Sequence, residues 1–310
     1  MTHHRNFSHQ IHLVYRLLIG IVLLFLPGVA YSQVVGKGYN NSMIYKIQGE
    51  TNTVYILGSL HALAEEYYPL TRAFSYAYYN SQKLVFEIDP EILFSKKIGT
   101  ERENYSTFQN GMTLKKALSS KTYGRLKKHL LGMGLNIEDI QNYKPWKAYL
   151  LASGGLDSSK DFRYDLGIEM YFYQRAKDAG KPIEGLETPK DQWDAFDKLT
   201  FKEQEALIIE VLKDRTKLEK DFKQLVKSWH QGDLEGMAKH VETYKTFPKY
   251  YHGILVRRNH NWVPKIEQFL TDTKNYFVIV GVAHLAGKDG LLTLLKKKGY
   301  ELERVSYVMP

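Results

Sequence analysis

The chain has 310 residues, 44% of them hydrophobic and 25% charged, so it is long enough to bury a sizeable core as one large domain. It contains no cysteine, which excludes disulfides, thiolate nucleophiles and thiolate metal sites and leaves His, Asp, Glu or backbone oxygen to hold any metal. The net charge of +9 comes from short basic runs dispersed along the chain. Dispersed runs are typical of solvated helix faces, so we expect no nucleic-acid partner, whereas weak association with an anionic membrane surface stays open.

Residues 1–32 have the order of a secretory signal peptide. A basic, polar start leads into the nearly unbroken apolar run Leu17 to Leu26, and small residues follow at the −3 and −1 positions of a signal-peptidase site. We expect cleavage between Ser32 and Gln33, which would leave residues 33–310 as a single exported domain, periplasmic or secreted. An uncleaved anchor is the alternative, although the apolar run is short for a membrane span.

The first part of the predicted domain has strand and helix patterns in turn. Met43 to Gln48 alternates apolar and polar residues, and a turn then leads into the apolar strand Thr53 to Gly58, which predicts a hairpin. A helix is expected from Pro69 to about Asn80, followed by the apolar strand Lys83 to Ile88. Strand, helix and strand in this order predict a parallel pair. Residues 91–112 are polar and irregular, and we expect a mobile loop there.

From residue 113 to about residue 270 the apolar spacing is mainly helical, which predicts a long helical insertion. Within it, Asp165 to Ala179 forms a clear helix and Pro182 to Leu186 a short strand, with Glu187 directly after it. The last helix of the insertion is expected from about Gly253 to Leu270, kinked or broken at Pro264.

The C-terminal part repeats the sequence pattern found at Thr53 to His61. Thr53 to Gly58 is followed by His61, and the predicted strand Tyr276 to Val280 is followed by Gly281 and His284 in the same Gly-x-x-His spacing. A helix from about Asp289 to Lys298 and a last strand from Glu301 to Val308 complete the chain. We therefore expect an α/β (α+β) fold with a central mixed sheet made from two pseudo-repeated halves.

Imidazole and carboxylate side chains follow three of these strands. His61 and His284 come after strands that end in glycine, where open α/β sheets place their chemistry, and Glu87 stands near the end of an otherwise apolar strand. A buried carboxylate is costly unless it is paired or bound to a metal, although a backbone amide or an arginine would also satisfy it. With Glu187 these residues would make a nitrogen and oxygen ligand set suited to zinc, manganese, cobalt or iron.

Arg258 lies on an inward helical stripe with Ile254, Trp262 and Ile266. A guanidinium in that position needs an anionic partner, which could be Glu187, Glu87 or a substrate carboxylate. The alternative is an arginine whose stem packs while its head reaches water.

Seven short motifs follow one another along the chain: Ile56 to His61, Phe86 to Asp89, Lys144 to Trp146, Gly167 to Glu169, Gly185 to Thr188 with Gln192, Arg258-Asn259 with Trp262, and Gly281 to Gly287. In this order they resemble the TraB/GumN family, which is related to the Tiki metalloproteases and more remotely to haem-uptake and erythromycin-esterase-like proteins. The resemblance extends from about Met43 to Tyr307. One departure is Glu169, where the family pattern has aspartate after Gly-Ile.

The resemblance implies a cleft between the two halves and metal-dependent proteolysis, with manganese or cobalt suggested and zinc also possible. Carried over residue by residue, it nominates His61, Glu87 and His284 as metal ligands. We therefore expect an exported metal-dependent hydrolase that cleaves a peptide or amide bond, with Glu187 assisting proton transfer and Arg258 orienting a carboxylate. The alternative is an envelope protein without turnover that binds haem, a peptide or another small ligand in the same cleft. The sequence leaves the oligomeric state open.

Overall fold

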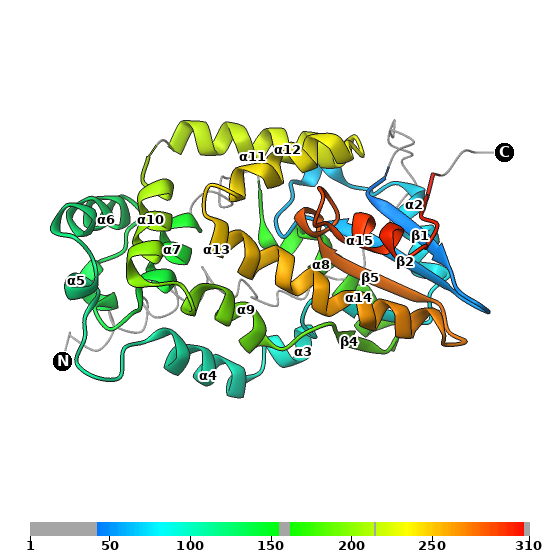
Figure 1. The fold of residues 1–310 in the computed structure, drawn as a ribbon, viewed down its shortest axis with the longest axis horizontal. Helices are drawn as coiled ribbons and strands as arrows, with labels where there is room; N and C mark the ends of the chain where they lie inside the picture. The colour runs from blue at the N-terminus through cyan, green and yellow to red at the C-terminus, as the bar shows by residue number, and fades with distance from the viewer. Residues whose placement is uncertain (1–41, 155–161, 214, 307–310) are drawn as a thin grey trace.

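A computed structural model describes residues 42–154, 162–213 and 215–306, so the predicted signal peptide lies outside the described part. A six-stranded mixed sheet occupies one end of the molecule and a group of helices the other (Figure 1). The strands are β1 (Ile44–Gln48), β2 (Thr53–Ser59), β3 (Lys83–Phe86), β4 (Ile183–Gly185), β5 (Tyr276–Gly281) and β6 (Glu303–Arg304). The helices are α2 (Arg72–Tyr79), α3 (Pro90–Leu93), α4 (Lys96–Ser106), α5 (Leu114–Ala117), α6 (Ser120–Gly132), α7 (Pro145–Ser153), α8 (Ile168–Asp178), α9 (Pro189–Asp197), α10 (Phe201–Val211), α11 (Arg215–His230), α12 (Leu234–Tyr244), α13 (Pro248–Tyr251), α14 (Arg257–Leu270) and α15 (Leu291–Lys297). The mixed α/β class is as predicted.

The sheet joins the two ends of the described chain. Its order is β4-β3-β5-β2-β1-β6, with β1 and β2 forming the predicted antiparallel hairpin. The predicted parallel orientation of β2 and β3 is confirmed, but the two strands are not neighbours: both are parallel to β5, which lies between them. Sequence neighbours cannot reveal this order, because the strand that separates β2 from β3 comes from the other end of the chain. The carboxyl ends of β2, β3, β4 and β5 consequently meet at one edge of the sheet.

Alternate residues of the central strands pack on opposite faces of the sheet, as the period of two in a strand requires. Tyr55 and Leu57 belong to a core with α2, α8 and residues of α11 and α12. Val54 and Ile56 belong to a second core with α14 and α15. Both faces of the sheet are therefore covered by helices, which explains why the central strands β2 and β5 are almost entirely apolar.

The helices at the other end of the molecule have a core of their own. Leu114, Leu126 and Ala148 are fully buried there, in a cluster built from α5, α6, α7 and α10. The mobile loop predicted for residues 91–112 is wrong for the most part, because α3 and α4 form in that segment. Asp89 and Ser95 cap these two helices through side-chain oxygens that accept backbone N–H bonds, and such caps stabilise helices with little apolar periodicity.

The last helix of the predicted insertion ends at Leu270 as expected, but α14 begins at Arg257 and is not broken at Pro264. Its buried stripe packs against the sheet on both sides of the proline. The last strand is expected from Glu301 to Val308, but among the described residues it covers only Glu303–Arg304, which pair with β1 at Tyr45 and Lys46; residues 307–308 lie outside the described part. The pseudo-repeat of two halves and the boundaries of the insertion stay predictions.

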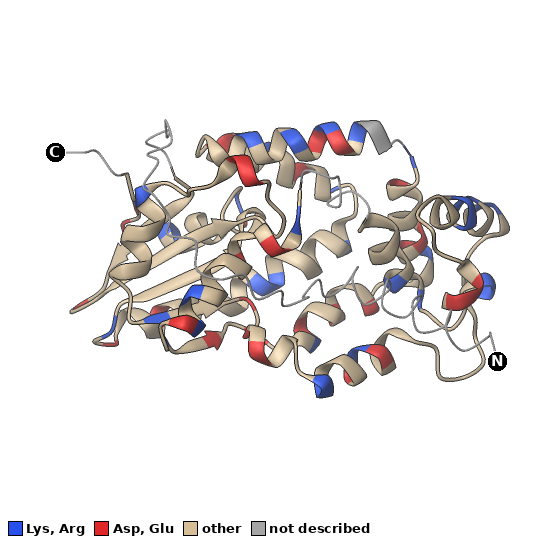
Figure 2. Ribbon diagram, turned by 180° about the vertical axis from the view of Figure 1, so that it is seen from behind, with Lys and Arg blue, Asp and Glu red and all other residues tan. Residues whose placement is uncertain are grey.

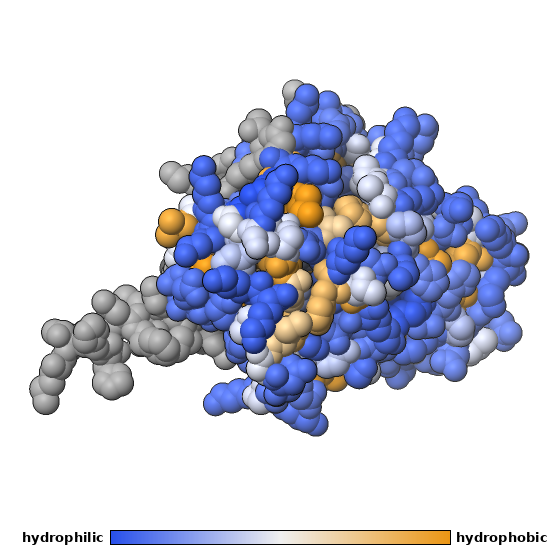
Figure 3. Space-filling model, turned by 60° about the vertical axis from the view of Figure 1, so that its left-hand side comes forward, coloured by the Kyte–Doolittle hydropathy of each residue, from blue (hydrophilic) through white to orange (hydrophobic). Residues whose placement is uncertain are grey.

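The surface is mainly polar. Figure 3 shows a largely hydrophilic face with a band of more hydrophobic residues through its middle. Acidic and basic residues are interleaved over the ribbon, most visibly along α11 (Figure 2). Among the described helices, none has the length and apolar content needed to cross a bilayer.

Candidate functional site

The three predicted metal ligands surround Gly281 at the carboxyl edge of the sheet. A Cβ added to Gly281 would lie 3.3 Å from Oε1 of Glu87, 3.8 Å from Nε2 of His61 and 3.8 Å from Cδ2 of His284. The parallel register brings about this meeting, because Ser59 pairs with Gly281 and Phe86 pairs with Ile279. Glycine at this position leaves open the space toward which the three side chains converge.

Gly58 allows the end of β2 to approach the turn that carries His284. A Cβ at Gly58 would lie 2.7 Å from a methyl carbon of Leu285 and 2.9 Å from one of Val282, closer than real side chains approach. The carbonyl oxygen of Gly58 accepts a hydrogen bond from the indole of Trp229, 2.7 Å away, so that α11 also holds this strand end.

Arg258 is the centre of a buried ionic cluster. Its side chain is 4% exposed, and its Nε and Nη2 donate to the carboxylate of Glu187 at 2.6–3.1 Å while Nη2 also donates to Glu87 at 2.5 Å. Its Nη1 donates to the carbonyl oxygen of Ile254 at 2.8 Å and to Nε2 of His284 at 3.0 Å. All five N–H groups of the guanidinium are thus used within the protein.

The sequence prediction that Arg258 has an anionic partner is confirmed, and both candidate glutamates fill that role. The predicted orientation of a substrate carboxylate by Arg258 would require at least one of these five hydrogen bonds to be exchanged.

The two glutamates of this cluster have opposite pKa shifts. Burial favours a higher pKa for Glu87, but Arg258, His284 and the N–H of Gly281 (2.7 Å from Oε1) overcome it and lower the pKa to about 2. Burial dominates at Glu187 and raises its pKa, although Arg258 opposes the shift. Glu87 is the ionised member that faces the space at Gly281, whereas Glu187 is 6% exposed and is held by Arg258 and the indole of Trp262.

His284 is a neutral, fixed imidazole. Its Nε2 must accept because Arg258 can only donate, so Nδ1 carries the proton and donates to Oδ1 of Asn259 at 2.6 Å. Asn259 is oriented in turn by its Nδ2, which donates to the carbonyl oxygen of Asp289 at 2.8 Å. Burial, followed by the charge of Arg258, lowers the pKa of His284 to about 3. The ring also packs against Trp262, with the ring centres 4.4 Å apart.

His61 has a different setting. Its side chain is 65% exposed, and its Nδ1 lies 2.8 Å from Oε1 of Glu169, which also accepts from the hydroxyl of Ser59. Burial alone would raise the pKa of Glu169, but the charge and hydrogen bond of His61, together with Ser59, lower it. The second oxygen, Oε2, is buried without a hydrogen-bond partner among the described residues. A carboxylate on Nδ1 fixes the imidazole tautomer and directs Nε2 toward the space at Gly281.

The start of α8 is joined to the loop that carries His61. The N–H of Ile168 donates to the carbonyl oxygen of Leu60 at 3.0 Å, and Leu63 and Arg163 exchange two backbone hydrogen bonds. Gly167 permits this approach, since a Cβ there would collide with the carbonyl oxygen of His61. The contact places Glu169, in the first turn of α8, against the imidazole.

The structure adds three residues to the predicted set, namely Glu169, Asn259 and Gln192. Gln192 donates to Oε2 of Glu87 at 3.0 Å. All three belong to the motifs that carry the family resemblance, which is the only sequence signal for them. None could be assigned a partner, because each contact joins segments far apart in the chain.

The donor chemistry at Gly281 fits a divalent metal in part. His61 and Glu87 offer a nitrogen and an oxygen of the type that borderline metals prefer. His284 does not offer its Nε2 in this arrangement, since Arg258 occupies that lone pair. Over the described residues, no group of three or more His, Cys, Asp or Glu side chains has an arrangement able to hold a metal ion.

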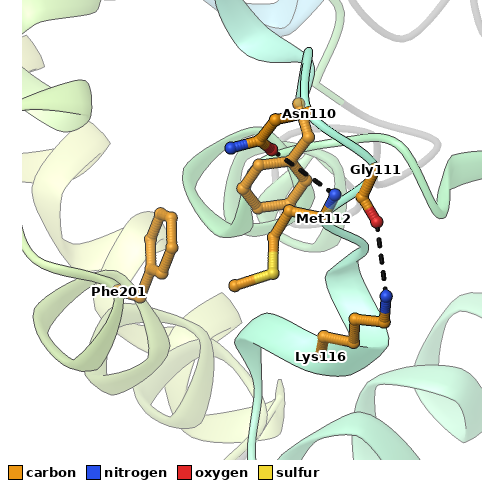
Figure 4. Close-up of a pocket in the computed structure, with 6 residues that line it drawn as sticks. Asn110, Gly111, Met112, Lys116 and Phe201 are labelled. Atoms are coloured by element: carbon orange, nitrogen blue, oxygen red, sulfur yellow. Dashed lines mark hydrogen bonds between the residues drawn. The ribbon is translucent and has the colours of Figure 1, made fainter.

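A separate pocket lies in the helical part, away from the strand ends (Figure 4). It is lined by Phe108, Met112 and Phe201 with Asn110, Gly111 and Lys116. No imidazole or carboxylate is among these lining residues, so the pocket offers no acid, base or metal ligand beyond one lysine.

Comparison with known proteins agrees with the motifs at the strand ends. No curated protein and no solved structure matched the chain. The model of the TraB/PrgY/gumN family, in contrast, matches residues 43–304, which span all six strands of the sheet and every residue of the site. The chain therefore belongs to the TraB/PrgY/gumN family.

Proposed function

We propose that this protein is an exported metal-dependent hydrolase that cleaves a peptide or amide bond. The observation that carries the proposal is the pairing of an exposed imidazole with a buried carboxylate. Nδ1 of His61 is bonded to Glu169, and its Nε2 is directed at the space that the ionised Glu87 also borders. The same pairing orients histidines that bind metals and histidines that act as bases.

The roles of the residues follow from their exposure. His61 and Glu87 are the side chains that meet a substrate or a metal, whereas Arg258, Glu187, Asn259 and His284 hold Glu87 in place from below. In this proposal Glu187 and Arg258 are positioning residues in place of the direct roles that the sequence suggested, because their polar atoms are engaged with each other.

A divalent metal, manganese or cobalt by family resemblance, would be held by Nε2 of His61 and Oε1 of Glu87. When bound there, such an ion lowers the pKa of water and polarises a carbonyl group. Glu169 keeps the proton on Nδ1 of His61, so that Nε2 carries the lone pair that would bind the metal. The Gly281 N–H and the Arg258 guanidinium keep Glu87 ionised at neutral pH.

A binding protein without turnover is the second candidate, and one observation favours it. Arg258 already neutralises Glu87 and satisfies His284, so the buried cluster is complete without a metal. The same strand-end space would then bind haem, a peptide or another small ligand.

Peptide digestion distinguishes the two candidates. The purified protein is incubated with a peptide library and added manganese or cobalt, alongside Glu87→Ala and, as a matched control, the exposed Glu101→Ala on α4. The hydrolase proposal expects cleavage by wild type and Glu101→Ala but not by Glu87→Ala. Absence of cleavage by wild type, with ligand binding that persists in Glu87→Ala, would establish the binding protein instead.

Export is tested independently of the chemistry. Expression of the full chain in a secreting host should yield a protein that begins at Gln33, detected by intact-mass analysis. A protein that keeps residues 1–32 and partitions with membranes would support the anchored alternative.

A further inference from the structure

We infer that Arg258 is the built-in cation of this site and that it keeps His284 out of the ligand shell of any metal bound there. The inference rests on the proposed metal-dependent function but concerns which residues provide the ligands. It departs from the ligand set His61, Glu87 and His284 that the sequence suggests.

The guanidinium of Arg258 is hydrogen-bonded to the two atoms that a metal ion shared by His284 and Glu87 would have to bind. Its Nη1 bonds Nε2 of His284 at 3.0 Å, and its Nη2 bonds Oε2 of Glu87 at 2.5 Å. His284 is 4% exposed and its other nitrogen is bonded to Asn259 at 2.6 Å, so neither ring nitrogen offers a lone pair. The ring cannot turn to present one without breaking both bonds and its packing against Trp262.

Arg258 itself is strongly fixed. Beyond Glu87 and His284 it is bonded to both oxygens of Glu187 and to the carbonyl oxygen of Ile254, the residue one turn earlier. Its guanidinium also lies over the ring of Trp262, 4.7 Å from the centre. Displacing it would leave two buried carboxylates without their cation, which is strongly unfavourable.

Charge repulsion works in the same direction. A divalent ion next to Nε2 of His284 would stand beside a buried guanidinium, where like charges interact through a low dielectric. His61 and Oε1 of Glu87 lie on the side of Glu87 away from Nη2 of Arg258, and Oε1 there accepts from the N–H of Gly281 at 2.7 Å and is 3.7 Å from Nε2 of His284. The site therefore offers two protein ligands, one fewer than the three of typical catalytic zinc sites, and leaves the remaining positions to water and substrate.

Manganese titration of paired variants tests the inference. Arg258→Met/Glu187→Gln removes the cation and one anion together, and the amide that replaces the carboxylate keeps an acceptor for the indole of Trp262. Arg257→Met/Glu267→Gln is the matched control, since it makes the same exchanges on the same helix outside the site. We expect the site variant to bind Mn²⁺ at least about tenfold more tightly than wild type, because His284 becomes available, and the control to bind as wild type does.

The contribution of His284 is then isolated. Adding His284→Ala to the site variant should reverse its gain in affinity for Mn²⁺. A folded site variant that binds no tighter than wild type overturns the inference, as does a gain that survives the addition of His284→Ala. Mn²⁺ binding that appears only in the site variant supports the inference even if the wild-type protein cleaves no peptide. The inference can therefore hold where the proposed hydrolase activity fails.

A second measurement uses the wild-type protein and tests the inference even if the site variant does not fold. In the wild-type protein, the imidazole ¹⁵N resonances are followed while Zn²⁺ is added. We expect the Nε2 resonance of His61 to take the large shift of a coordinated nitrogen and that of His284 to move much less, although it lies 3.7 Å from Oε1 of Glu87. A shift at Nε2 of His284 as large as that of His61 would overturn the inference.

Discussion

The carboxylate of Glu169 and the imidazole of His61 form a pair, with Oε1 of the glutamate 2.8 Å from Nδ1 of the histidine. The glutamate lies in the first turn of α8, where the helix dipole favours a negative charge, and Ser59 donates to the same oxygen. One buried carboxylate thus sets both the tautomer and the orientation of an exposed ring.

Replacing Glu169 should weaken metal binding without removing a metal ligand. Glu169→Ala is expected to lower the affinity for Mn²⁺ by about 10- to 100-fold, the usual effect of losing the partner of a ligating histidine. Glu169→Asp should recover part of the loss, because it keeps a carboxylate on a shorter stem. Isothermal titration measures both, with Glu138→Ala on an exposed turn as the control. Equal affinities for folded Glu169→Ala and wild type would contradict the assigned role.

Gly167 and Gly124 should respond in opposite ways to the same substitution. A Cβ at Gly167 would collide with the carbonyl oxygen of His61, so Gly167→Ala should push α8 away from the loop and destabilise the protein by about 1–3 kcal/mol. Gly124 lies inside α6 with nothing within 4 Å of an added Cβ, so Gly124→Ala should stabilise by about 0.5–1 kcal/mol. Urea unfolding measures both changes. A neutral Gly167→Ala would show that α8 and the loop are not tightly joined.

The local patterns predicted the parts of the site that lie next to one another in sequence. Gly-x-x-His after an apolar run correctly indicated strand ends at β2 and β5, and the helical stripe correctly turned Arg258 inward. The insertion of β5 between β2 and β3 could not be read from the sequence, because strand order depends on pairing between distant segments. The contact of Glu169 with the loop after β2 is of the same kind.

The sequence also could not show that every N–H group of the Arg258 guanidinium is hydrogen-bonded within the protein. A stripe shows that an arginine points inward, but it does not show how many acceptors lie there. Two glutamates, one carbonyl oxygen and one imidazole together use all its donors. That count changes the expected role of Arg258 from binding a substrate to holding the site.

Removing Arg258 alone should be far more damaging than removing it with a partner. Arg258→Ala leaves Glu87 and Glu187 buried without their cation, and a loss of about 3–5 kcal/mol in the free energy of unfolding is expected. Arg258→Met/Glu187→Gln removes a charge pair and fills much of the volume, so its loss should be smaller. Urea unfolding at neutral pH compares them. Equal losses for the two variants would show that packing, and not the unpaired charge, dominates.

The buried, neutral state of His284 should make the protein sensitive to acid well above the range of its carboxylates. Burial, followed by Arg258, lowers the pKa of His284 from 6.5 to about 3. Between these values the unfolded chain binds a proton that the folded chain does not. The free energy of unfolding therefore has its full value above the pKa of His284 in the unfolded chain. Below that pKa it decreases as the pH falls, by up to about 1.4 kcal/mol for each pH unit.

Urea unfolding between about pH 7.5 and 5, in the presence of a chelator, measures this dependence across the unfolded pKa. His284→Asn should be less stable than wild type at the upper end of this range, because contacts to Arg258 and Asn259 are lost, yet its stability should change less with pH. His260→Asn, at an exposed position on the same helix as Arg258, should keep the wild-type slope. If the stability of His284→Asn changed with pH as steeply as that of wild type, protonation of His284 would not be what destabilises the fold. The assignment of a neutral imidazole to His284 would then be wrong.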